Sequence, residues 1–257
     1  MKIIPLENIP FYQSNSQNLG IQTFTSFLSG KEQFIFLDDH LERLLKGADY
    51  LYPKELWPSK KSEIKDFLAK EFVPSHYFRL TIFEGNLLFF KKPHEIKDPH
   101  LSLAKAKSAK VTSIIPSFVK NSHYLLSTIE IQEAKKRKLD DVLFFDQQGN
   151  ATEASTSNIF VVLNENEILT PKTSSMVLEG VTRKKLIEFL KLEKYTVIES
   201  DISQSEMESA REIWLTNAIQ GVRLVDRFEK LELYKDKTIY QSIVMKFGRF
   251  GEKFNHE

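Results

Sequence analysis

The chain has 257 residues, of which 41% are hydrophobic and 28% are charged, and its formal net charge is +1. These values indicate a globular protein of one or two domains and give no reason to expect nucleic acid or an anionic membrane as a partner. The absence of cysteine excludes disulfides, thiolate metal sites and a cysteine nucleophile. The N-terminus has no apolar signal-peptide core, and no apolar run is long enough to span a membrane, so we expect a cytoplasmic protein.

The first hundred residues alternate strand-like and helix-like patterns. Strands are predicted over 21–28 and 34–37, around a Ser-Gly-Lys turn, and an amphipathic helix over 38–51 follows them. The next expected elements are a helix over 61–72 and a strand pair over 77–83 and 87–91. A polar, proline-bearing stretch comes next. We therefore expect an N-terminal domain over 1–103 and a C-terminal domain over 104–257.

The second domain is expected to mix strands and helices, which makes the whole chain α+β. Its predicted elements, in chain order, are a strand over 109–115, a helix over 127–136, a strand pair within 141–162, a strand over 168–170, a helix over 181–192, and strands over 196–201 and 212–218. No GxGxxG motif follows a strand, so a Rossmann nucleotide site is not expected. The six histidines show no ligand spacing, so no metal site is expected.

Three features suggest pyridoxal phosphate, which needs a lysine amine, a partner for its ring nitrogen and a phosphate cradle. Lys120 lies in an apolar, aromatic stretch, where partial desolvation favours the free amine. Glu153 lies between two apolar strands, where its carboxylate could face the ring nitrogen. Val181 and Thr182 open a glycine-led helix whose amides and dipole suit a phosphate, and Arg43 could add a bidentate contact.

Each of these residues also fits an ordinary role. A single lysine in a lysine-rich chain is seldom catalytic, Glu153 fits a turn glutamate in water, and Arg43 fits a surface salt bridge. The cofactor hypothesis therefore depends on their order and spacing along the chain.

Several segments, in register across nearly the whole chain, resemble the class IV (fold type IV) pyridoxal-phosphate enzymes. They are HLERL at 40–44, YFRLTIFEG at 77–85, Lys120, LDDVLFFDQQGNATEASTSNIF at 139–160, LTPKTSSMVLEGVTR at 169–183 and EIWLTNAIQGVRLV at 212–225. This family includes branched-chain aminotransferases, D-amino acid aminotransferases and aminodeoxychorismate lyases. The resemblance implies a homodimer with a two-domain fold similar to D-amino acid aminotransferase: a small N-terminal α/β sandwich and a larger C-terminal pseudo-barrel.

The resemblance also implies roles for individual residues. Lys120 would be the catalytic lysine that holds the cofactor as a Schiff base and moves protons, and Glu153 would pair with the pyridine nitrogen. The turn at Asn217 and Ala218 would close the phosphate cradle or meet the substrate carboxylate. The implied cofactor-binding residues are Arg43, Lys120, Tyr124, Glu153, Asn158, Val181, Thr182, Asn217 and Ala218, and the implied substrate residues are Ser26, Tyr77 and Arg79.

Two reactions compete within this resemblance. A 4-amino-4-deoxychorismate lyase would release pyruvate and form 4-aminobenzoate for folate synthesis, whereas a branched-chain or D-amino acid transaminase would pass the amino group to a 2-oxo acid. The Phe24-Thr25-Ser26 triplet, the Lys120–Glu153 separation and the Asn217-Ala218 pair resemble the lyases, and we favour that reaction. The Tyr77-x-Arg79 strand resembles the transaminases. A catalytically silent binding protein is a more remote alternative.

The chain also departs from the family pattern. Thr25 follows Phe24 where members commonly have Phe-Glu, and the N-terminus is short. These departures concern the substrate pocket and leave the cofactor residues untouched.

Overall fold

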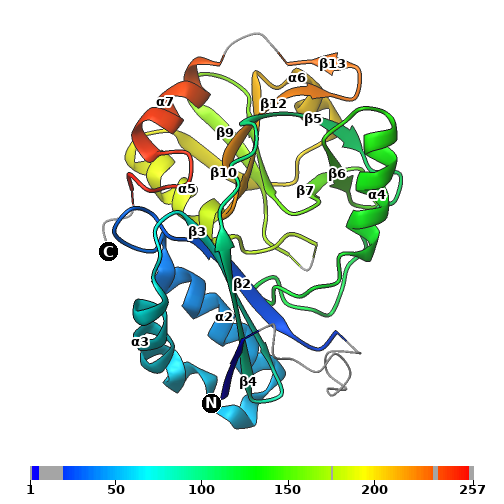
Figure 1. Cartoon of the computed structure of the whole chain (residues 1–257). Coiled ribbons are helices and arrows are strands. Elements are labelled where there is room, and N and C mark those ends of the chain that lie inside the picture. Colours follow the sequence, from blue (N-terminus) through cyan, green and yellow to red (C-terminus); the bar gives the residue numbers. More distant parts are fainter. Residues whose placement is uncertain (1, 6–19, 175, 234–236, 255–257) are drawn as a thin grey trace. The chain divides into compact units, whose positions relative to one another are not determined.

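The computed structural model describes residues 2–5, 20–174, 176–233 and 237–254. Contacts between Cα atoms divide the chain into two compact units (Figure 1). The first unit contains the residues up to 95 and the short segment 118–123, and the second contains 96–117 and 124–256. The chain thus returns to the first unit for six residues around Lys120. The domain boundary expected between residues 103 and 104 stays a prediction.

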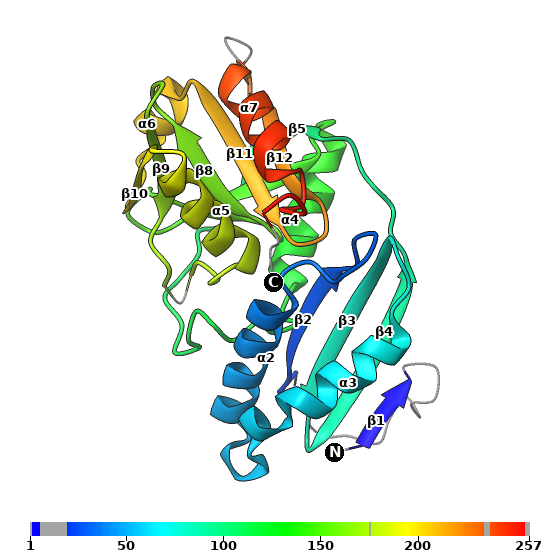
Figure 2. The same cartoon turned by 90° about the vertical axis from the view of Figure 1, so that its left-hand side faces the viewer.

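The first unit is a four-stranded sheet in the order β1-β4-β3-β2, in which only the β1–β4 pair is parallel. Helices α2 and α3 lie against one face of this sheet (Figure 2). The elements are β1 (Lys2–Pro5), β2 (Thr23–Leu28), α2 (Leu37–Leu51), the short 3-10 helices η2 (Pro53–Glu55) and η3 (Trp57–Lys60), α3 (Lys61–Glu71), β3 (His76–Phe83) and β4 (Asn86–Pro93).

The local sequence explains most of this unit. Helix α2 buries Leu41, Leu44, Leu45 and Ala48, whose spacing places them on one helical face. The expected strand over 34–37 is wrong. Phe34 forms only an isolated bridge to Ser29, and Phe36 turns into the left-handed region at φ 52°, so that α2 begins at Leu37.

The second unit is built on a nine-stranded sheet in the order β10-β9-β8-β11-β12-β5-β6-β7, with β13 paired to β12. Its strands are β5 (His100–Lys105), β6 (Asp141–Phe145), β7 (Ala151–Ala154), β8 (Asn158–Val162), β9 (Glu167–Pro171), β10 (Thr196–Ser200), β11 (Glu212–Asn217), β12 (Gly221–Phe228) and β13 (Leu231–Glu232). Its helices are α4 (Leu125–Lys136), α5 (Val181–Leu192), α6 (Gln204–Ser209) and α7 (Thr238–Phe247).

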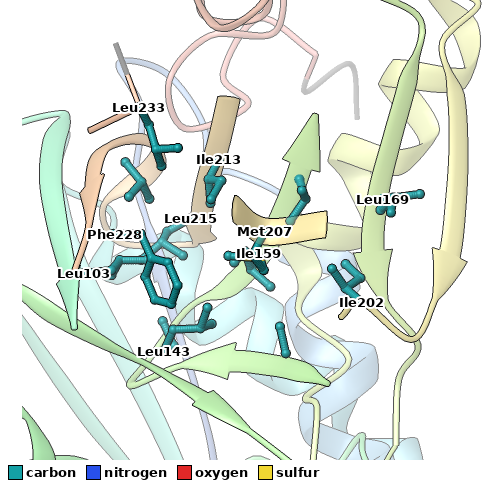
Figure 3. Close-up of a cluster of buried hydrophobic side chains, with 14 of the residues drawn as sticks. Leu103, Leu143, Ile159, Leu169, Ile202, Met207, Ile213, Leu215, Phe228 and Leu233 are labelled. Carbon is teal, nitrogen blue, oxygen red and sulfur yellow. The ribbon is translucent and has the colours of Figure 1, made fainter. Parts of the chain in front are cut away.

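The large sheet curls on itself. The amide of Ala151, at the start of edge strand β7, donates to the carbonyl of Ile202, just beyond the opposite edge strand β10, at 2.7 Å. Figure 3 shows the apolar cluster that the curl encloses, with Leu143, Ile159 and Leu215 among its members. Because side chains alternate along a strand, β5, β6, β8 and β11 each contribute two residues of this cluster that are two positions apart.

Most predicted elements are present, and α5 has the predicted bounds. The expected strand over 109–115 is wrong, because this segment is an irregular loop. Its Lys110 amide donates one hydrogen bond to Phe145, and the side chains of Val111 and Ile114 are exposed. Strands β5 and β12, in the middle of the sheet order, were not predicted. None of the described helices is long and apolar enough to cross a membrane.

Candidate active site

Lys120 is anchored to the edge of the first unit's sheet. Its carbonyl oxygen accepts hydrogen bonds from the Phe24 amide at 2.9 Å and from Thr23 Oγ1 at 3.2 Å. Both donors belong to β2, which ends the order of this sheet, so the segment 118–123 uses hydrogen-bonding capacity that an edge strand leaves open. The Lys120 amine lies 5.0 Å from the centre of the Phe24 ring. These two hydrogen bonds fix the Lys120 backbone, from which the side chain with the amine extends.

Arg79 contacts the same aromatic ring. The central carbon of its guanidinium lies 3.7 Å from the centre of the Phe24 ring, within the range of a cation–π interaction. Its Nη2 donates to Ser122 Oγ at 3.0 Å, and its Nε donates to Thr81 Oγ1 at 3.3 Å. An amine and a planar guanidinium therefore lie close to one phenyl ring.

The three residues predicted to meet the substrate share one face of the sheet. Ser26 and Arg79 are register partners on β2 and β3, and cross-strand partners project to the same side. Ser26 Oγ lies 3.0 Å from the Tyr77 hydroxyl. The structure thus brings Ser26, Tyr77 and Arg79 together.

The Phe24-Thr25-Ser26 triplet divides between the two faces of the sheet, because alternate residues of a strand point in opposite directions. Thr25 points toward α2, where its hydroxyl lies 2.8 Å from His40 Nδ1 and accepts a hydrogen bond from Arg43 Nη2 at 3.2 Å. The Thr25 hydroxyl therefore contacts His40 and Arg43.

His40 is a neutral member of this network. Burial holds the pKa of its imidazole well below the ordinary value of 6.5, and the positive charges of Arg43 and Lys120 lower it further against the opposite effect of Asp39. Because the guanidinium can only donate, the hydroxyl hydrogen of Thr25 is available to Nδ1 of His40. Arg43 is therefore connected, through the Thr25 hydroxyl, to the buried and uncharged imidazole of His40.

In the second unit, Glu153 lies on β7 with both carboxylate oxygens engaged. Oε1 accepts a hydrogen bond from the Lys110 amine at 2.5 Å, and Oε2 accepts one from the Leu178 amide at 2.9 Å. The side chain is largely buried. Glu153 is therefore held in one orientation by a cation and a backbone amide.

The N-terminus of α5 provides the second predicted feature of this unit. The helix begins at Val181, its N-cap is Gly180, and it has neither a side-chain cap nor an acidic residue in the first turn. A Cβ atom on Gly180 would lie 2.0 Å from Asn158 Oδ1, so Asn158 requires glycine at this position. The side-chain amide nitrogen of Asn158, Nδ2, donates to the Leu178 carbonyl at 2.9 Å.

Thr182 supplies an observation that points to a ligand. It is 2% exposed, and its hydroxyl has no hydrogen-bond partner among the described residues. Buried hydroxyls are normally paired, and an uncapped helix N-terminus attracts anions. The residues present therefore fit a phosphate group at the start of α5.

Three further predicted residues occupy turns and helix ends. Asn217 ends β11, accepts hydrogen bonds from the amides of the next turn through Oδ1, and donates to Ser157 Oγ at 2.9 Å. Ala218 begins that turn. Tyr124 is the N-cap of α4, and its carbonyl accepts from the Thr128 amide at 2.8 Å.

The predicted residues thus form two sets, each within one unit. The first set is Lys120, Arg43, Ser26, Tyr77 and Arg79, and the second is Tyr124, Glu153, Asn158, Val181, Thr182, Asn217 and Ala218. Contacts of His40 and Lys110 with these sets were not predicted. His40 had a sequence signal, since it opens the HLERL segment that contains Arg43. Nothing in the sequence marks Lys110. The described part of the chain has no group of three or more histidine or acidic residues that could hold a metal ion.

The fold is that of the fold type IV enzymes, which use pyridoxal phosphate. It matches a Legionella pneumophila protein provisionally described as a 4-amino-4-deoxychorismate lyase, with a TM-score of 0.83 and 21% identity over 95% of this chain and 97% of that one. An aminotransferase from Brucella abortus, bound to the cofactor, matches with a TM-score of 0.81 and 20% identity over 97% of this chain and 94% of that one.

The sequence then gives the family. Residues 22–228 match the family model for class IV aminotransferases, and the chain belongs to this family. Among the curated proteins, a "probable branched-chain-amino-acid aminotransferase" from Aquifex aeolicus is 28% identical over 86% of this chain and 80% of its own length. The protein is therefore a pyridoxal-phosphate-dependent enzyme.

Proposed function

We propose that the enzyme acts on a polar amino substrate that carries a carboxylate, and that its reaction is the 4-amino-4-deoxychorismate lyase reaction. The observation that carries this proposal is the pair of cationic groups around Phe24. The Lys120 amine lies 5.0 Å from the ring centre and the Arg79 guanidinium carbon lies 3.7 Å from it. In the proposal, Lys120 binds the cofactor covalently and moves a proton at the substrate, while Arg79 binds a substrate carboxylate.

Pyridoxal phosphate, when bound, supplies an electron sink for the charge that develops on the substrate. Glu153 would keep the ring nitrogen protonated, because a carboxylate stabilises an adjacent cation. The Val181 and Thr182 amides, the Thr182 hydroxyl and Arg43 would bind the phosphate. The buried hydroxyl of Thr182, which has no partner among the described residues, supports this role. We also propose cofactor contacts for four further residues, as the resemblance implies: Asn158, Asn217, Ala218 and Tyr124.

The choice of the lyase is supported by the hydroxyl groups that lie beside Arg79 on its face of the sheet. Ser26, Tyr77 and Thr81 add hydroxyl groups to this face. An aliphatic side chain gains its binding energy from apolar surface, whereas a substrate with several oxygen atoms needs hydrogen-bond donors. This group of hydroxyls around Arg79 therefore suits a polar acid better than a branched aliphatic amino acid.

A transaminase is the second candidate, and a separate observation favours it. Two curated relatives of this chain, from Aquifex aeolicus and Thermotoga maritima, are each named "probable branched-chain-amino-acid aminotransferase". In that reaction the same Lys120 amine would move a proton from the substrate to the cofactor, and a 2-oxo acid would then accept the amino group. We also propose that the enzyme is a cytoplasmic homodimer, as the resemblance implies.

The cofactor roles are tested by absorbance. The purified protein with pyridoxal phosphate should show a near-visible band, and Lys120→Ala should abolish it because no amine remains to bind the cofactor covalently. Lys46→Ala is a matched control, since Lys46 is another lysine of this unit that lies near an aromatic ring, that of Phe118. A band that persists in Lys120→Ala would remove Lys120 from the proposal.

The reaction is tested by product analysis. With 4-amino-4-deoxychorismate, the lyase should release 4-aminobenzoate and pyruvate in equal amounts, without an added 2-oxo acid as amino-group acceptor. If no 4-aminobenzoate forms while branched-chain or D-amino acids transfer their amino group to 2-oxoglutarate, the transaminase proposal replaces the lyase.

A further inference from the structure

Lys110 and Glu153 form a largely buried ion pair in the second unit. The Lys110 amine and Glu153 Oε1 are 2.5 Å apart, and the two side chains are 21% and 18% exposed. A pair with this little solvent contact is screened less than an ion pair at the surface. Lys110 comes from the irregular loop after β5 and Glu153 from β7, so the pair joins two segments that are distant in sequence.

The surroundings of Lys110 fix its amine in place. The same amine donates to the Met176 carbonyl at 3.1 Å and lies 5.4 Å from the centre of the Phe144 ring. The Lys110 backbone amide donates to Phe145, at the end of β6, at 2.8 Å. The lysine is thus held by its backbone, by a carbonyl and by an aromatic face, and it presents its charge to Glu153.

The ion pair is connected to the start of α5. Glu153 Oε2 accepts from the Leu178 amide, and Asn158 donates to the Leu178 carbonyl. Lys110, Glu153 and Asn158 therefore hold the segment 176–178, which leads through Gly180 into the helix N-terminus. The carboxylate proposed to face the ring nitrogen and the helix end proposed to bind the phosphate share one hydrogen-bonded frame.

We infer that Lys110 is a positioning residue for the cofactor, which acts by holding the Glu153 carboxylate in the orientation that meets the ring nitrogen. A carboxylate can accept about four hydrogen bonds. Lys110 and the Leu178 amide each occupy one position, on different oxygens, and leave capacity on both oxygens for a ring N–H. Lys110 also offsets part of the carboxylate charge, and so adjusts how strongly Glu153 attracts the ring proton. This inference rests on the proposed role of Glu153.

The test compares Lys110→Met with Lys107→Met. Lys107 belongs to the same loop, and its amine forms a 3.4 Å ion pair with Glu133, but its side chain is 70% exposed. Lys110→Met should weaken binding of pyridoxal phosphate about 10- to 100-fold, the range that corresponds to a charge-assisted hydrogen bond. It should also change the pH dependence of the near-visible band. Lys107→Met should leave both unchanged, and Lys110→Arg should restore most of the affinity.

The route through Glu153 is tested by a double-mutant cycle. In a Glu153→Gln background, Lys110→Met should change the cofactor affinity by less than about twofold, because the carboxylate on which it acts is gone. Equal losses in the two backgrounds, or a Lys110→Met protein that matches Lys107→Met, would overturn the inference. If Lys110→Met does not fold, Lys110→Arg against Lys110→Gln makes the same comparison with smaller changes in shape.

The Glu153→Gln and Lys110→Met variants distinguish a failure of this inference from a failure of the proposed role of Glu153. A Glu153→Gln protein with normal affinity and a normal band would remove Glu153 from the cofactor site, and the inference with it. A clear effect of Glu153→Gln without an effect of Lys110→Met would overturn only the inference.

Discussion

The two faces of the first unit's sheet are made from alternate residues of the same strands, but their chemistry is opposite. Phe27, Phe78 and Leu80 point into the apolar core under α2 and α3. On the other face, Phe24 contacts the Arg79 guanidinium and the Lys120 amine, and Ser26 contacts the Tyr77 hydroxyl. Neighbouring residues of one strand therefore have different roles: one packs in the core, and the next lies on the face where we propose that the reaction takes place.

The largest effect should come from the core face. Phe78 is fully buried, and Phe78→Ala should lower the free energy of unfolding by about 3–5 kcal/mol, because it removes apolar contacts and leaves a cavity. Phe90→Ala is the matched control, since Phe90 is the β4 partner of Arg79 on the opposite face and is only half-buried. Urea unfolding measures both variants. Equal losses would contradict the division between the two faces.

Arg79 should show the converse behaviour. Arg79→Ala should lower kcat/KM about 100-fold through loss of a charge-assisted bond to the substrate carboxylate, with a much smaller effect on unfolding. Arg79→Lys should recover little of this loss, because an ammonium lacks the planar pair of donors. The control is Lys92→Ala, an exposed cation paired with Tyr77 in the neighbouring strand. If Lys92→Ala lowers kcat/KM as much, the loss comes from removing a positive charge in this region and not from a specific contact of Arg79.

Thr25 tests how the helix side of the sheet supports Arg43. Thr25→Val should weaken binding of pyridoxal phosphate about tenfold, because Arg43 loses a fixed partner and His40 Nδ1 is left buried without its hydroxyl. Thr25→Ser keeps the hydroxyl and should bind the cofactor nearly as the unchanged protein does. Titration of absorbance against cofactor concentration measures the affinities. Similar weakening in both variants would point to the lost methyl group.

The smallest effect should be the pH dependence that His40 adds to stability. Burial, followed by the charge of Arg43, lowers the pKa of folded His40 well below 6.5, so that the unfolded chain binds a proton more readily. The stabilisation is then complete above pH 6.5 and is lost as the pH falls toward the folded value, at up to about 1.4 kcal/mol per pH unit. Unfolding of the unchanged protein and of His40→Gln should differ in slope between pH 6.5 and 5.5. Equal slopes would show that His40 titrates normally.

Several features could be predicted because they depend on neighbours in sequence. The apolar spacing of α2 and the glycine-led start of α5 define amphipathic helices from local pattern alone, and α5 has the predicted bounds. The strand over 109–115 was predicted incorrectly for the same reason. Its local pattern suits a strand, but a strand needs a hydrogen-bonded partner along its length. Among the described residues, this segment forms one backbone bond to a neighbouring strand, from Lys110 to Phe145.

The family and its cofactor were determined by the sequence alone, because the segments that carry the resemblance keep their order along the chain. Tertiary structure decided what each side chain contacts. It separated Thr25 from Ser26 across the sheet, anchored the Lys120 carbonyl to β2, and paired Lys110 with Glu153. These contacts join residues that are distant in sequence, and strand register and loop path, which the local pattern does not encode, set the distances between them.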